Sequence, residues 1–364
     1  MNQIHEAERE KPMRSIHIPA SRAYEVLIGG GLLDEAGTRI RRVTESDRAA
    51  IVAGEKVLRL YGERLLDTLG RAGFQTVFVS HPGGEEHKNL ESYGALLRFL
   101  SENRLSRADV LISLGGGVTG DLAGFTAATY QRGMSFVQIP TTLLAMVDAS
   151  VGGKTALNLP TGKNQVGCFY QPSLVLCDPE VLSTLPEDEF HCGMAEVIKY
   201  AMLGDPELMD LLLREPIEER LAQLIARCVE MKRNYVAADE YDRGSRQLLN
   251  LGHSFGHALE RCSAGAIRHG EAVSIGMVMA ARAALARGIC DEETVQTLVT
   301  ALRRYALPTE PAFSARELSE AMLADKKRSG ERLRLVLPEA VGRCRIESVP
   351  INELDRWLCQ GGAR

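Results

Sequence analysis

The stretch VLISLGGGVTGD, from Val110 to Asp121, decides the fold of this chain. Its first five residues are apolar or small and predict a buried strand, and the glycines that follow turn the chain into a helix. Gly115, Gly117 and Gly120 have the spacing G-x-G-x-x-G, in which glycine lets the backbone approach a pyrophosphate at a helix amino terminus. The spacing alone is a weak signal, because a tight strand-to-helix turn without a ligand has the same sequence.

The rest of the first half repeats this alternation of strand and helix. Helical patterns such as 57–69 and 90–102 separate short β-branched or aromatic runs, and such an order predicts a largely parallel sheet covered on both faces. The glycine stretch follows the fourth of these runs, and no acidic residue stands at the usual distance to hold a ribose. We therefore expect a Rossmann-like variant of the dinucleotide-binding fold. The predicted strands are 24–28, 49–52, 76–79, 110–114, 136–139 and 174–177.

Helical periodicity takes over after Pro186. We expect an α/β nucleotide-binding domain over residues 1–186 and a mostly α-helical domain over 187–364. A pair of runs at 333–337 and 343–349 predicts a short hairpin on the second domain. The predicted helices are 187–202, 217–235, 248–262, 271–287, 292–305 and 315–327.

Composition narrows the class of protein. With 364 residues, 45% hydrophobic and 25% charged, the chain has the mixture of a soluble globular protein of two domains. A net charge of -5 argues against nucleic acid as the main partner. The best candidate for a membrane span, 272–289, contains Arg282 and Arg287, and residues 1–14 have no apolar core of a signal peptide. Eight cysteines without a C-x-x-C pair suit a reduced compartment, so we expect a cytoplasmic protein with no membrane partner.

Polar residues with no packing rationale gather in PTTLLAMVDASVGGKT, residues 140–155, and in the turn GKN at 162–164. These segments hold one carboxylate, Asp148, and two lysines, Lys154 and Lys163, among glycines and hydroxyls. A buried run would not contain so many polar groups unless they met a ligand. The segment is not a P-loop, because the position of its leading glycine is occupied by Asp148.

Three of the eight histidines, His253, His257 and His269, fall within 17 residues. His253 and His257 lie four apart on one helical face, and this clustering favours a divalent metal site over isolated core or surface histidines. Catalytic zinc uses three protein ligands and an open position, and the best carboxylate to join the histidines is Glu196. Lys199 lies three residues later on the same helix face, so an ordinary surface ion pair with Glu196 is the alternative. The protease signature H-E-x-x-H is absent.

Further cations and amides lie near predicted helix ends and glycines, where they could bind carboxylate and phosphate groups. Taken singly, each is more often a solvated surface residue. They are Arg132, Lys154, Lys163, Asn164, Lys232, Arg246, Asn250, Lys326 and Lys327.

These motifs occur together, in order and with compatible spacing, from Gly84 to Gly342. The chain closely resembles the 3-dehydroquinate synthase family of sugar-phosphate cyclases. The motifs that carry the resemblance are GEEHK at 84–88, GGGVTGD at 115–121, RG at 132–133, the block at 140–155, GKN at 162–164, AEVIK at 195–199, NLGHSFGH at 250–257, HGE at 269–271 and DKK at 325–327.

The resemblance implies bound NAD, a divalent metal that is usually zinc with cobalt as a further possibility, and a homodimer. It implies metal ligation by Glu196, His253 and His269, and assistance in proton transfer by His257. The residues implied to meet NAD are Glu85, Lys88, Gly115, Gly116, Gly117, Asp121, Thr141, Thr142, Asp148, Lys163 and Thr184. Those implied to meet the substrate are Lys154, Asn164, Lys199, Lys232, Arg246, Asn250 and one or both of Lys326 and Lys327, with Arg132 reaching the partner subunit's site.

The implied reaction converts 3-deoxy-D-arabino-heptulosonate 7-phosphate, a phosphorylated sugar acid, to 3-dehydroquinate and phosphate in the shikimate pathway of aromatic amino acid and chorismate biosynthesis. One departure from the family is the run AGEK at 53–56, which replaces a usual threonine and an acidic or amide residue near the adenosine ribose. The alternatives are a sister cyclase with another sugar phosphate, a metal-dependent polyol dehydrogenase and an inactive nucleotide-binding scaffold. Asn164, Arg246 and Asn250 favour the dehydroquinate activity, because a substrate carboxylate demands such groups.

Overall fold

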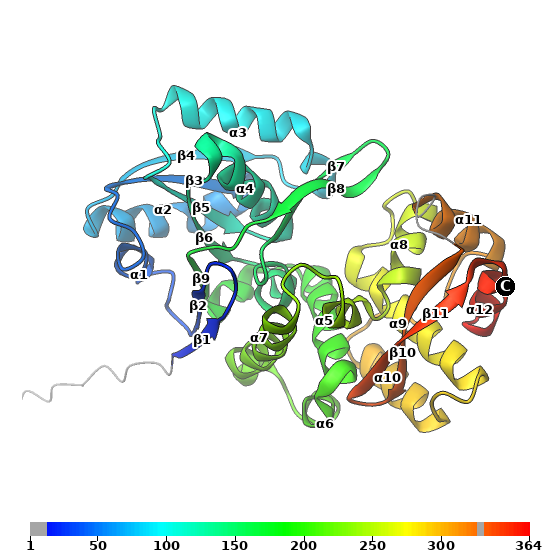
Figure 1. The fold of residues 1–364 in the computed structure, drawn as a ribbon. Coiled ribbons are helices and arrows are strands. Elements are labelled where there is room, and N and C mark those ends of the chain that lie inside the picture. Colours follow the sequence, from blue (N-terminus) through cyan, green and yellow to red (C-terminus); the bar gives the residue numbers. More distant parts are fainter. Residues whose placement is uncertain (1–12, 326–330) are drawn as a thin grey trace, which may run out of the picture. The chain divides into compact units, whose positions relative to one another are not determined.

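Seven strands of the amino-terminal half form one sheet in the order β1-β2-β9-β6-β5-β3-β4 (Figure 1). The structure is a computed structural model that describes residues 13–325 and 331–364. Strand β1 pairs antiparallel with β2, and the remaining pairs are parallel. The strands are β1 (Arg14–Ile18), β2 (Tyr24–Ile28), β3 (Arg48–Gly54), β4 (Gln75–His81), β5 (Val110–Gly115), β6 (Ser135–Pro140) and β9 (Leu174–Cys177).

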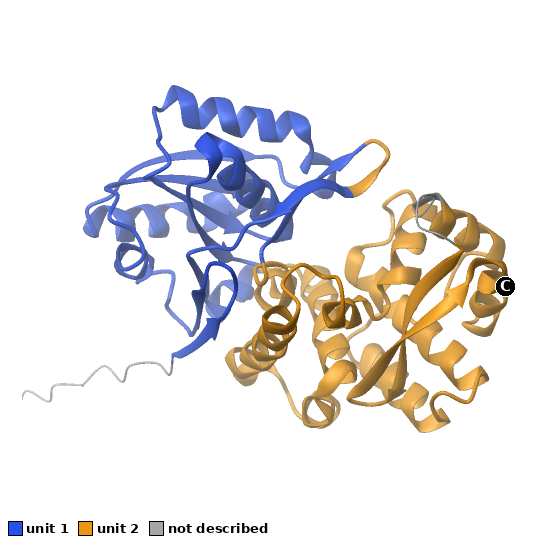
Figure 2. Ribbon diagram, viewed as in Figure 1, with its two compact units in different colours: residues 1–141, 153–159, 164–184 blue, residues 142–152, 160–163, 185–364 orange. Residues whose placement is uncertain are grey.

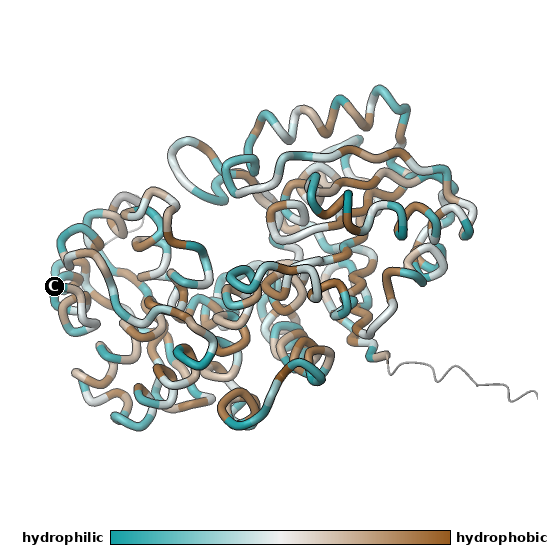
Figure 3. The backbone as a smooth tube through the Cα atoms, turned by 180° about the vertical axis from the view of Figure 1, so that it is seen from behind, coloured by the Kyte–Doolittle hydropathy of each residue, from teal (hydrophilic) through white to brown (hydrophobic). Residues whose placement is uncertain are grey.

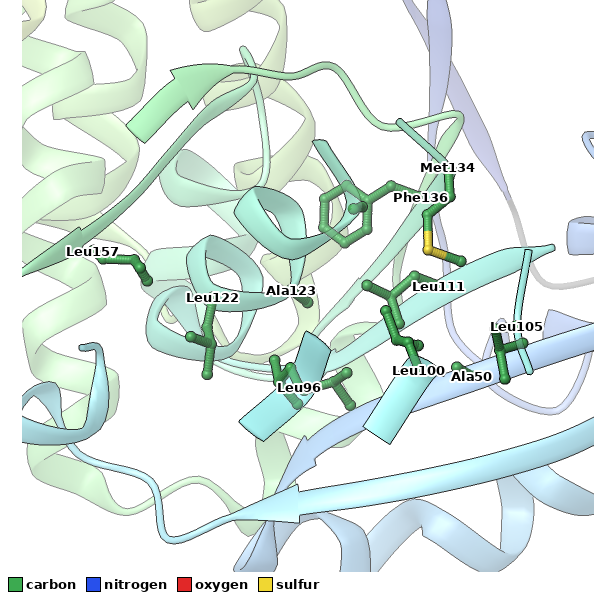
Figure 4. Close-up of a cluster of buried hydrophobic side chains, with 12 residues drawn as sticks. Ala50, Leu96, Leu100, Leu105, Leu111, Leu122, Ala123, Met134, Phe136 and Leu157 are labelled. Carbon is green, nitrogen blue, oxygen red and sulfur yellow. The ribbon is translucent and has the colours of Figure 1, made fainter. Parts of the chain in front are cut away.

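Helices cover both faces of this sheet. In Figure 1, α3 (Leu90–Glu102) and α4 (Gly117–Thr129) lie on one face, and α1 (Ala36–Arg41) and α2 (Glu55–Arg71) lie on the other. The core under α3 and α4 is built from leucines of both helices and from apolar residues of the strands (Figure 4). Burial on both faces explains why the central strands β3, β5, β6 and β9 have mostly apolar sequences, and Figure 3 draws such segments in brown.

The strand order reverses between β3 and β5. From β3 the chain moves outward to β4, and it then returns to β5 on the opposite side of β3. Ligands of such sheets bind at the carboxyl ends of the strands at this reversal. Here the two carboxyl ends are Gly54 and Gly115, so both the glycine stretch and the unusual run at 53–56 lie at the expected place for a nucleotide.

Three strands of the first half were not predicted. Strand β1 is one of them, so the glycine stretch follows the fifth strand and not the fourth. The other two, β7 (Lys154–Leu159) and β8 (Gly162–Phe169), form a separate two-stranded sheet. Their polar residues obscured the strand pattern, because most side chains of β8 are exposed or half-buried.

The second unit comprises residues 142–152, 160–163 and 185–364, and the first comprises the remainder up to 184 (Figure 2). The hairpin predicted for the second unit is confirmed as β10 (Arg332–Ala340) paired with β11 (Arg343–Pro350). A turn of π-helix spans Ala145–Ala149. The helices are α5 (Glu187–Gly204), α6 (Pro206–Arg214), α7 (Leu221–Ala238), α8 (His253–Cys262), α9 (His269–Ala286), α10 (Glu292–Arg304), α11 (Ala315–Asp325) and α12 (Leu354–Gln360).

The predicted fold class is thus confirmed as α/β with a Rossmann-like sheet and a mostly helical second part. One predicted helix, 248–262, is wrong as a single element. It divides into a 3-10 turn, Ser245–Asn250, and α8, because Gly252 takes φ 80°. Among the described residues no helix has the length and apolarity to cross a membrane.

Candidate active site

Glu196, His253 and His269 bring three potential metal ligands together in the second unit. Glu196 lies in the middle of α5, and the two histidines are the first residues of α8 and α9. Oε1 of Glu196 lies 3.5 Å from Nε2 of His253 and 3.5 Å from Nε2 of His269. The three ligand atoms all lie within 4.8 Å of one another, so residues up to 73 positions apart in the chain share one small volume.

The turn before α8 aims His253. Gly252 has φ 80°, a left-handed conformation that side-chain-bearing residues avoid, and it starts α8 at the histidine. Nδ1 of His253 lies 3.2 Å from the carbonyl oxygen of Leu251. A carbonyl only accepts, so Nδ1 carries the proton and donates it, and Nε2 keeps its lone pair toward Glu196.

A divalent cation fits this donor set. Two imidazole nitrogens and one carboxylate oxygen are the ligands of many catalytic zinc sites, which leave a further position open. The second oxygen of Glu196, Oε2, forms an ion pair with Lys199, so Oε1 remains to face the histidines. The surface ion pair considered above as an alternative exists, but both of its residues are 1% exposed, and burial makes it part of the site.

Protonation of the three groups follows from these contacts. Burial favours the neutral form of Glu196, but the Lys199 ammonium and the two imidazoles outweigh it and lower its pKa to about 2. Burial lowers the pKa of His253 to about 3, which keeps its Nε2 unprotonated. For His269, hydrogen bonds to Glu196 and Glu260 outweigh burial and raise the pKa to about 9.

Two more side chains stand beside the metal group. His257 is exposed, and its ring centroid lies 5.6 Å from that of His253 and 6.3 Å from that of His269. Glu260 is buried, with Oε1 3.3 Å from Nδ1 of His269 and 2.9 Å from Nζ of Lys163. Ligand atoms of His257, Glu260 and His269 also lie within 4.8 Å of one another. Sequence reasoning missed Glu260, although its place seven residues after His253 on one helix face was a usable signal.

A half-buried carboxylate, Asp148, lies at the centre of a second cluster of charged side chains. It lies in the π-helical turn and accepts a hydrogen bond of 2.5 Å from the hydroxyl of Tyr200. Nζ of Lys232 lies 3.0 Å from Oδ1 of Asp148, and Nζ of Lys199 lies 3.8 Å from the same atom. Lys199 therefore links Asp148 to Glu196. Tyr200 was not among the predicted site residues, and nothing in its sequence position separates it from an ordinary core tyrosine.

Burial and pairing act in opposite directions on these groups. Burial would raise the pKa of Asp148, but the two lysine ammoniums hold it well below its usual range. For Lys199, the Asp148 and Glu196 carboxylates outweigh burial and raise the pKa. For Lys232, burial prevails over Asp148 and lowers the pKa to about 8. Lys232 is thus a cation that loses its proton in the weakly alkaline range.

Among the residues that the structure describes, Arg246 is the largest fully buried side chain. Its Nη2 donates to the carbonyl oxygen of Gly152 at 3.0 Å, and its Nη1 donates to that of Glu240 at 2.5 Å. Asn250 ends the 3-10 turn that begins just before Arg246 and is half-buried. Both residues belong to the same unit as Lys199 and Lys232.

The first unit holds most of the residues predicted to meet NAD. Gly115 ends β5, Gly116 precedes α4 and Gly117 begins it, and no side chain caps the first amides of that helix. Helix amino termini of this kind bind phosphate groups. The amide of Thr141 donates to the carbonyl oxygen of Gly115 at 3.0 Å, which joins the ends of β5 and β6. Thr184 shares a hydrogen bond of 2.5 Å with the hydroxyl of Tyr61.

Lys88 connects several of these residues. It is buried, forms an ion pair with Asp121 and donates to Oδ1 of Asn164 at 2.6 Å. Glu85 accepts from the side-chain amide of Asn158 at 2.7 Å. Asn164, predicted to meet the substrate, thus lies beside Lys88, which is predicted to meet NAD.

The remaining predicted residues are spread over the structure. Arg132 and Lys154 are exposed residues of the first unit. Thr142, Asp148 and Lys163, predicted to meet NAD, belong to the second unit. Lys326 and Lys327 lie outside the described residues.

Two family models match consecutive segments of the chain. A family model described as 3-dehydroquinate synthase N-terminal matches residues 78–192, and one described as 3-dehydroquinate synthase C-terminal matches 193–328. The chain is 44% identical to a 3-dehydroquinate synthase of Neisseria meningitidis over 95% of this chain and 98% of that protein.

Solved structures show the same architecture. A 2-epi-5-epi-valiolone synthase from Streptomyces hygroscopicus, crystallised with NAD+ and Zn2+, is 28% identical, has a TM-score of 0.85 and is matched over 93% of this chain and 96% of its own. A 2-deoxy-scyllo-inosose synthase is similar in fold, with a TM-score of 0.86 and 24% identity over 95% of this chain and 99% of its own.

Proposed function

The chain belongs to the 3-dehydroquinate synthase family, and we propose how its own residues divide the work of that family's reaction. The substrate is 3-deoxy-D-arabino-heptulosonate 7-phosphate, and the products are 3-dehydroquinate and phosphate. The reaction eliminates phosphate and closes a carbocycle, which makes the enzyme a lyase. The observation that carries the proposal is the meeting of Glu196, His253 and His269 beside the buried Lys199.

Glu196, His253 and His269 are proposed to hold a divalent cation, most simply zinc, and the glycine stretch of the first unit is proposed to hold NAD. When bound, NAD would supply an acceptor for the hydride of a substrate alcohol and would later return it, and the cation would supply a Lewis acid for the oxygen of that alcohol. Loss of hydride makes the neighbouring C–H acidic, and loss of that proton expels phosphate. NAD is therefore unchanged at the end of each turnover.

The residues of the second unit bind the anionic substrate and move its protons. Lys199, Lys232 and Arg246 offer cations, and Asn250 offers an amide, for the carboxylate, hydroxyl and phosphate groups. His257 lies beside the metal group and is exposed, so it is proposed to pass protons between the substrate and solvent. Lys154, Asn164 and one or both of Lys326 and Lys327 complete the proposed substrate set.

The remaining NAD contacts are proposed on the same family resemblance. Lys88, Asp121 and Thr141 are held close to the glycine stretch by the bonds described above, which supports their assignment to the cofactor. Glu85, Thr142, Asp148, Lys163 and Thr184 complete the set. For Asp148, the lysines around it equally support a contact with substrate.

A second candidate is a sister cyclase with a different sugar phosphate. The likeness to a valiolone synthase at a TM-score of 0.85 favours it. The decisive assay supplies purified protein, NAD and zinc with either the heptulosonate phosphate or sedoheptulose 7-phosphate, and measures phosphate and cyclic product. We expect turnover of the heptulosonate phosphate alone. Turnover of sedoheptulose 7-phosphate alone would assign the chain to the sister group.

We further propose a division into functional domains at 1–186 and 187–364, a cytoplasmic location and a homodimer in which Arg132 reaches the partner's site. The exposure of Arg132 supports the last point. Sedimentation equilibrium tests it, because a monomer at working concentration would exclude a shared site.

A further inference from the structure

Glu260 offers a buried carboxylate to the outer nitrogen of a metal-binding histidine. Its Oε1 lies 3.3 Å from Nδ1 of His269, and Nε2 of the same ring lies 3.5 Å from Glu196. Glu260 is 4% exposed, so its own carboxylate is buried at this contact. We propose that Glu260 is a positioning residue that sets the metal affinity of the site through His269. The inference rests on the metal site proposed above.

The direction of the hydrogen bond gives the reason. An ionised carboxylate accepts only, so Nδ1 of His269 must donate and carry the ring proton. Nε2 is then the nitrogen left for a cation, and it is the one that faces Glu196. A carboxylate partner also makes the imidazole a stronger donor to a metal than a neutral partner does. At its Nδ1 atom His253 has such a neutral partner, the carbonyl oxygen of Leu251, so among the described residues Glu260 is the only ionised partner of the two Nδ1 atoms.

Glu260 is better suited to act on the metal through His269 than to bind the metal directly. Oε1, the atom that faces His269, also accepts a hydrogen bond of 2.9 Å from the ammonium of Lys163. A cation bound to that oxygen would be placed against another positive charge. The carboxylate therefore has two fixed partners, His269 of the metal group and Lys163 at the start of β8.

Metal affinity of the substrate-free protein is the direct test. It is measured by competition for zinc between the protein and a chelator, without NAD or substrate. We expect Glu260→Ala to weaken zinc binding by about 10- to 100-fold. Glu260→Gln, which has nearly the same shape and can still accept from Nδ1, is expected to lose less. An unchanged affinity in both variants would overturn the proposal.

Glu271→Gln is the matched control. Glu271 is also a carboxylate at the start of α9, two residues from His269, but its Oε2 accepts from the amide of Arg268 at 2.9 Å. Removing its charge changes the electrostatics near the site without touching the His269 ring. We expect zinc affinity within about threefold of wild type, and a loss as large as that of Glu260→Ala would mean that general charge and not positioning is responsible.

Two further measurements distinguish a positioning role of Glu260 from a merely structural role. Cobalt-loaded Glu260→Gln should show shifted visible absorption bands, because the His269–metal bond changes, and an unchanged spectrum would contradict this. Lys163→Met removes the competing ammonium while leaving Glu260 in place. It should bind zinc as tightly as wild type or more tightly, and a loss beyond about threefold would show that the ion pair, and not the contact with His269, supports the site.

Failure of this inference is distinguishable from failure of the proposed function. If wild-type protein does not retain zinc or cobalt, the metal site itself is wrong. If wild-type protein retains the metal and both Glu260 variants bind it with the same affinity, only the role assigned to Glu260 is wrong. Glu260→Gln keeps the test valid should Glu260→Ala fail to fold, which thermal unfolding would reveal.

Discussion

Lys232 holds Asp148 at two points. Its ammonium donates to the backbone carbonyl oxygen of Asp148 at 2.6 Å and lies 3.0 Å from Oδ1 of the same residue. A turn of π-helix, a rare form that often occurs at functional sites, is thereby fixed from the side of α7. The cluster holds one carboxylate against two buried ammoniums, and its stability and its titration can be tested separately.

Replacing Asp148 by Asn should destabilise the protein strongly. The substitution leaves the buried ammoniums of Lys199 and Lys232 without one of their carboxylates, and breaking a buried pair in this way costs about 3–5 kcal/mol. Urea unfolding measures the loss. Asp210→Asn removes a carboxylate from an exposed ion pair with Arg214 and should change the free energy of unfolding by less than about 1 kcal/mol. Equal effects of the two substitutions would refute the buried network.

Lys232 should give the pH profile an alkaline limb. Its pKa is lowered to about 8, so above that pH the free enzyme loses a cation proposed to bind substrate. The value of kcat/KM, which reports groups of the free enzyme, should fall about tenfold for each further pH unit. In Lys232→Arg the guanidinium stays charged, and the limb should move upward by more than about one unit. The same limb in both proteins would assign the titration to another group.

His269 and His257 should have different functions, one as a metal ligand and the other in proton transfer. His269→Ala removes a ligand that faces Glu196 at 3.5 Å, so the variant should lose zinc on dialysis. His257→Ala should keep the metal and slow turnover by about 10²- to 10⁴-fold, the range for a lost proton-transfer group. Metal content by atomic absorption and kcat are the measurements. Equal metal loss in both variants would place His257 among the ligands instead.

The glycine stretch should be intolerant of a methyl group. A Cβ at Gly115 would overlap the side chain of Thr119, whose hydroxyl lies 3.0 Å from Nε2 of the buried His81. Gly115→Ala should lower the free energy of unfolding by about 1–3 kcal/mol and weaken NAD binding, measured by fluorescence titration. Gly70→Ala in α2, where a Cβ meets nothing within 4 Å, is the control and should leave NAD affinity unchanged. Tight NAD binding by Gly115→Ala would contradict the assignment of this turn.

Much of the fold could be predicted because buried strands and helices have recognisable patterns of apolar residues in the local sequence. Strand β9 (Leu174–Cys177) and helix α3 (Leu90–Glu102) have the predicted bounds, since the first is apolar throughout and the second is amphipathic. Strands β7 and β8 were missed because their polar and exposed residues follow no such rule. The break at Gly252 was missed because a single glycine also occurs within helices.

The metal site could be predicted only in part from the sequence pattern of the residues. His253 and His257 could be placed on one helix face by spacing, but the approach of Glu196 depends on how α5, α8 and α9 pack. That set came from family resemblance, and the structure brings its three members together. Tyr200 was missed because a helix-face position does not reveal which neighbouring element a side chain contacts, and for Glu260 the spacing from His253 could indicate the shared face but not the contact with His269 of α9.

The central claim is that NAD is reduced and reoxidised within each turnover. Phosphate release and the near-ultraviolet absorbance of NADH should be followed together in one sample containing the heptulosonate phosphate, NAD and zinc. The account predicts phosphate and carbocycle in equal amounts with no net NADH. Accumulation of NADH in step with the consumption of substrate would contradict it and would identify a dehydrogenase.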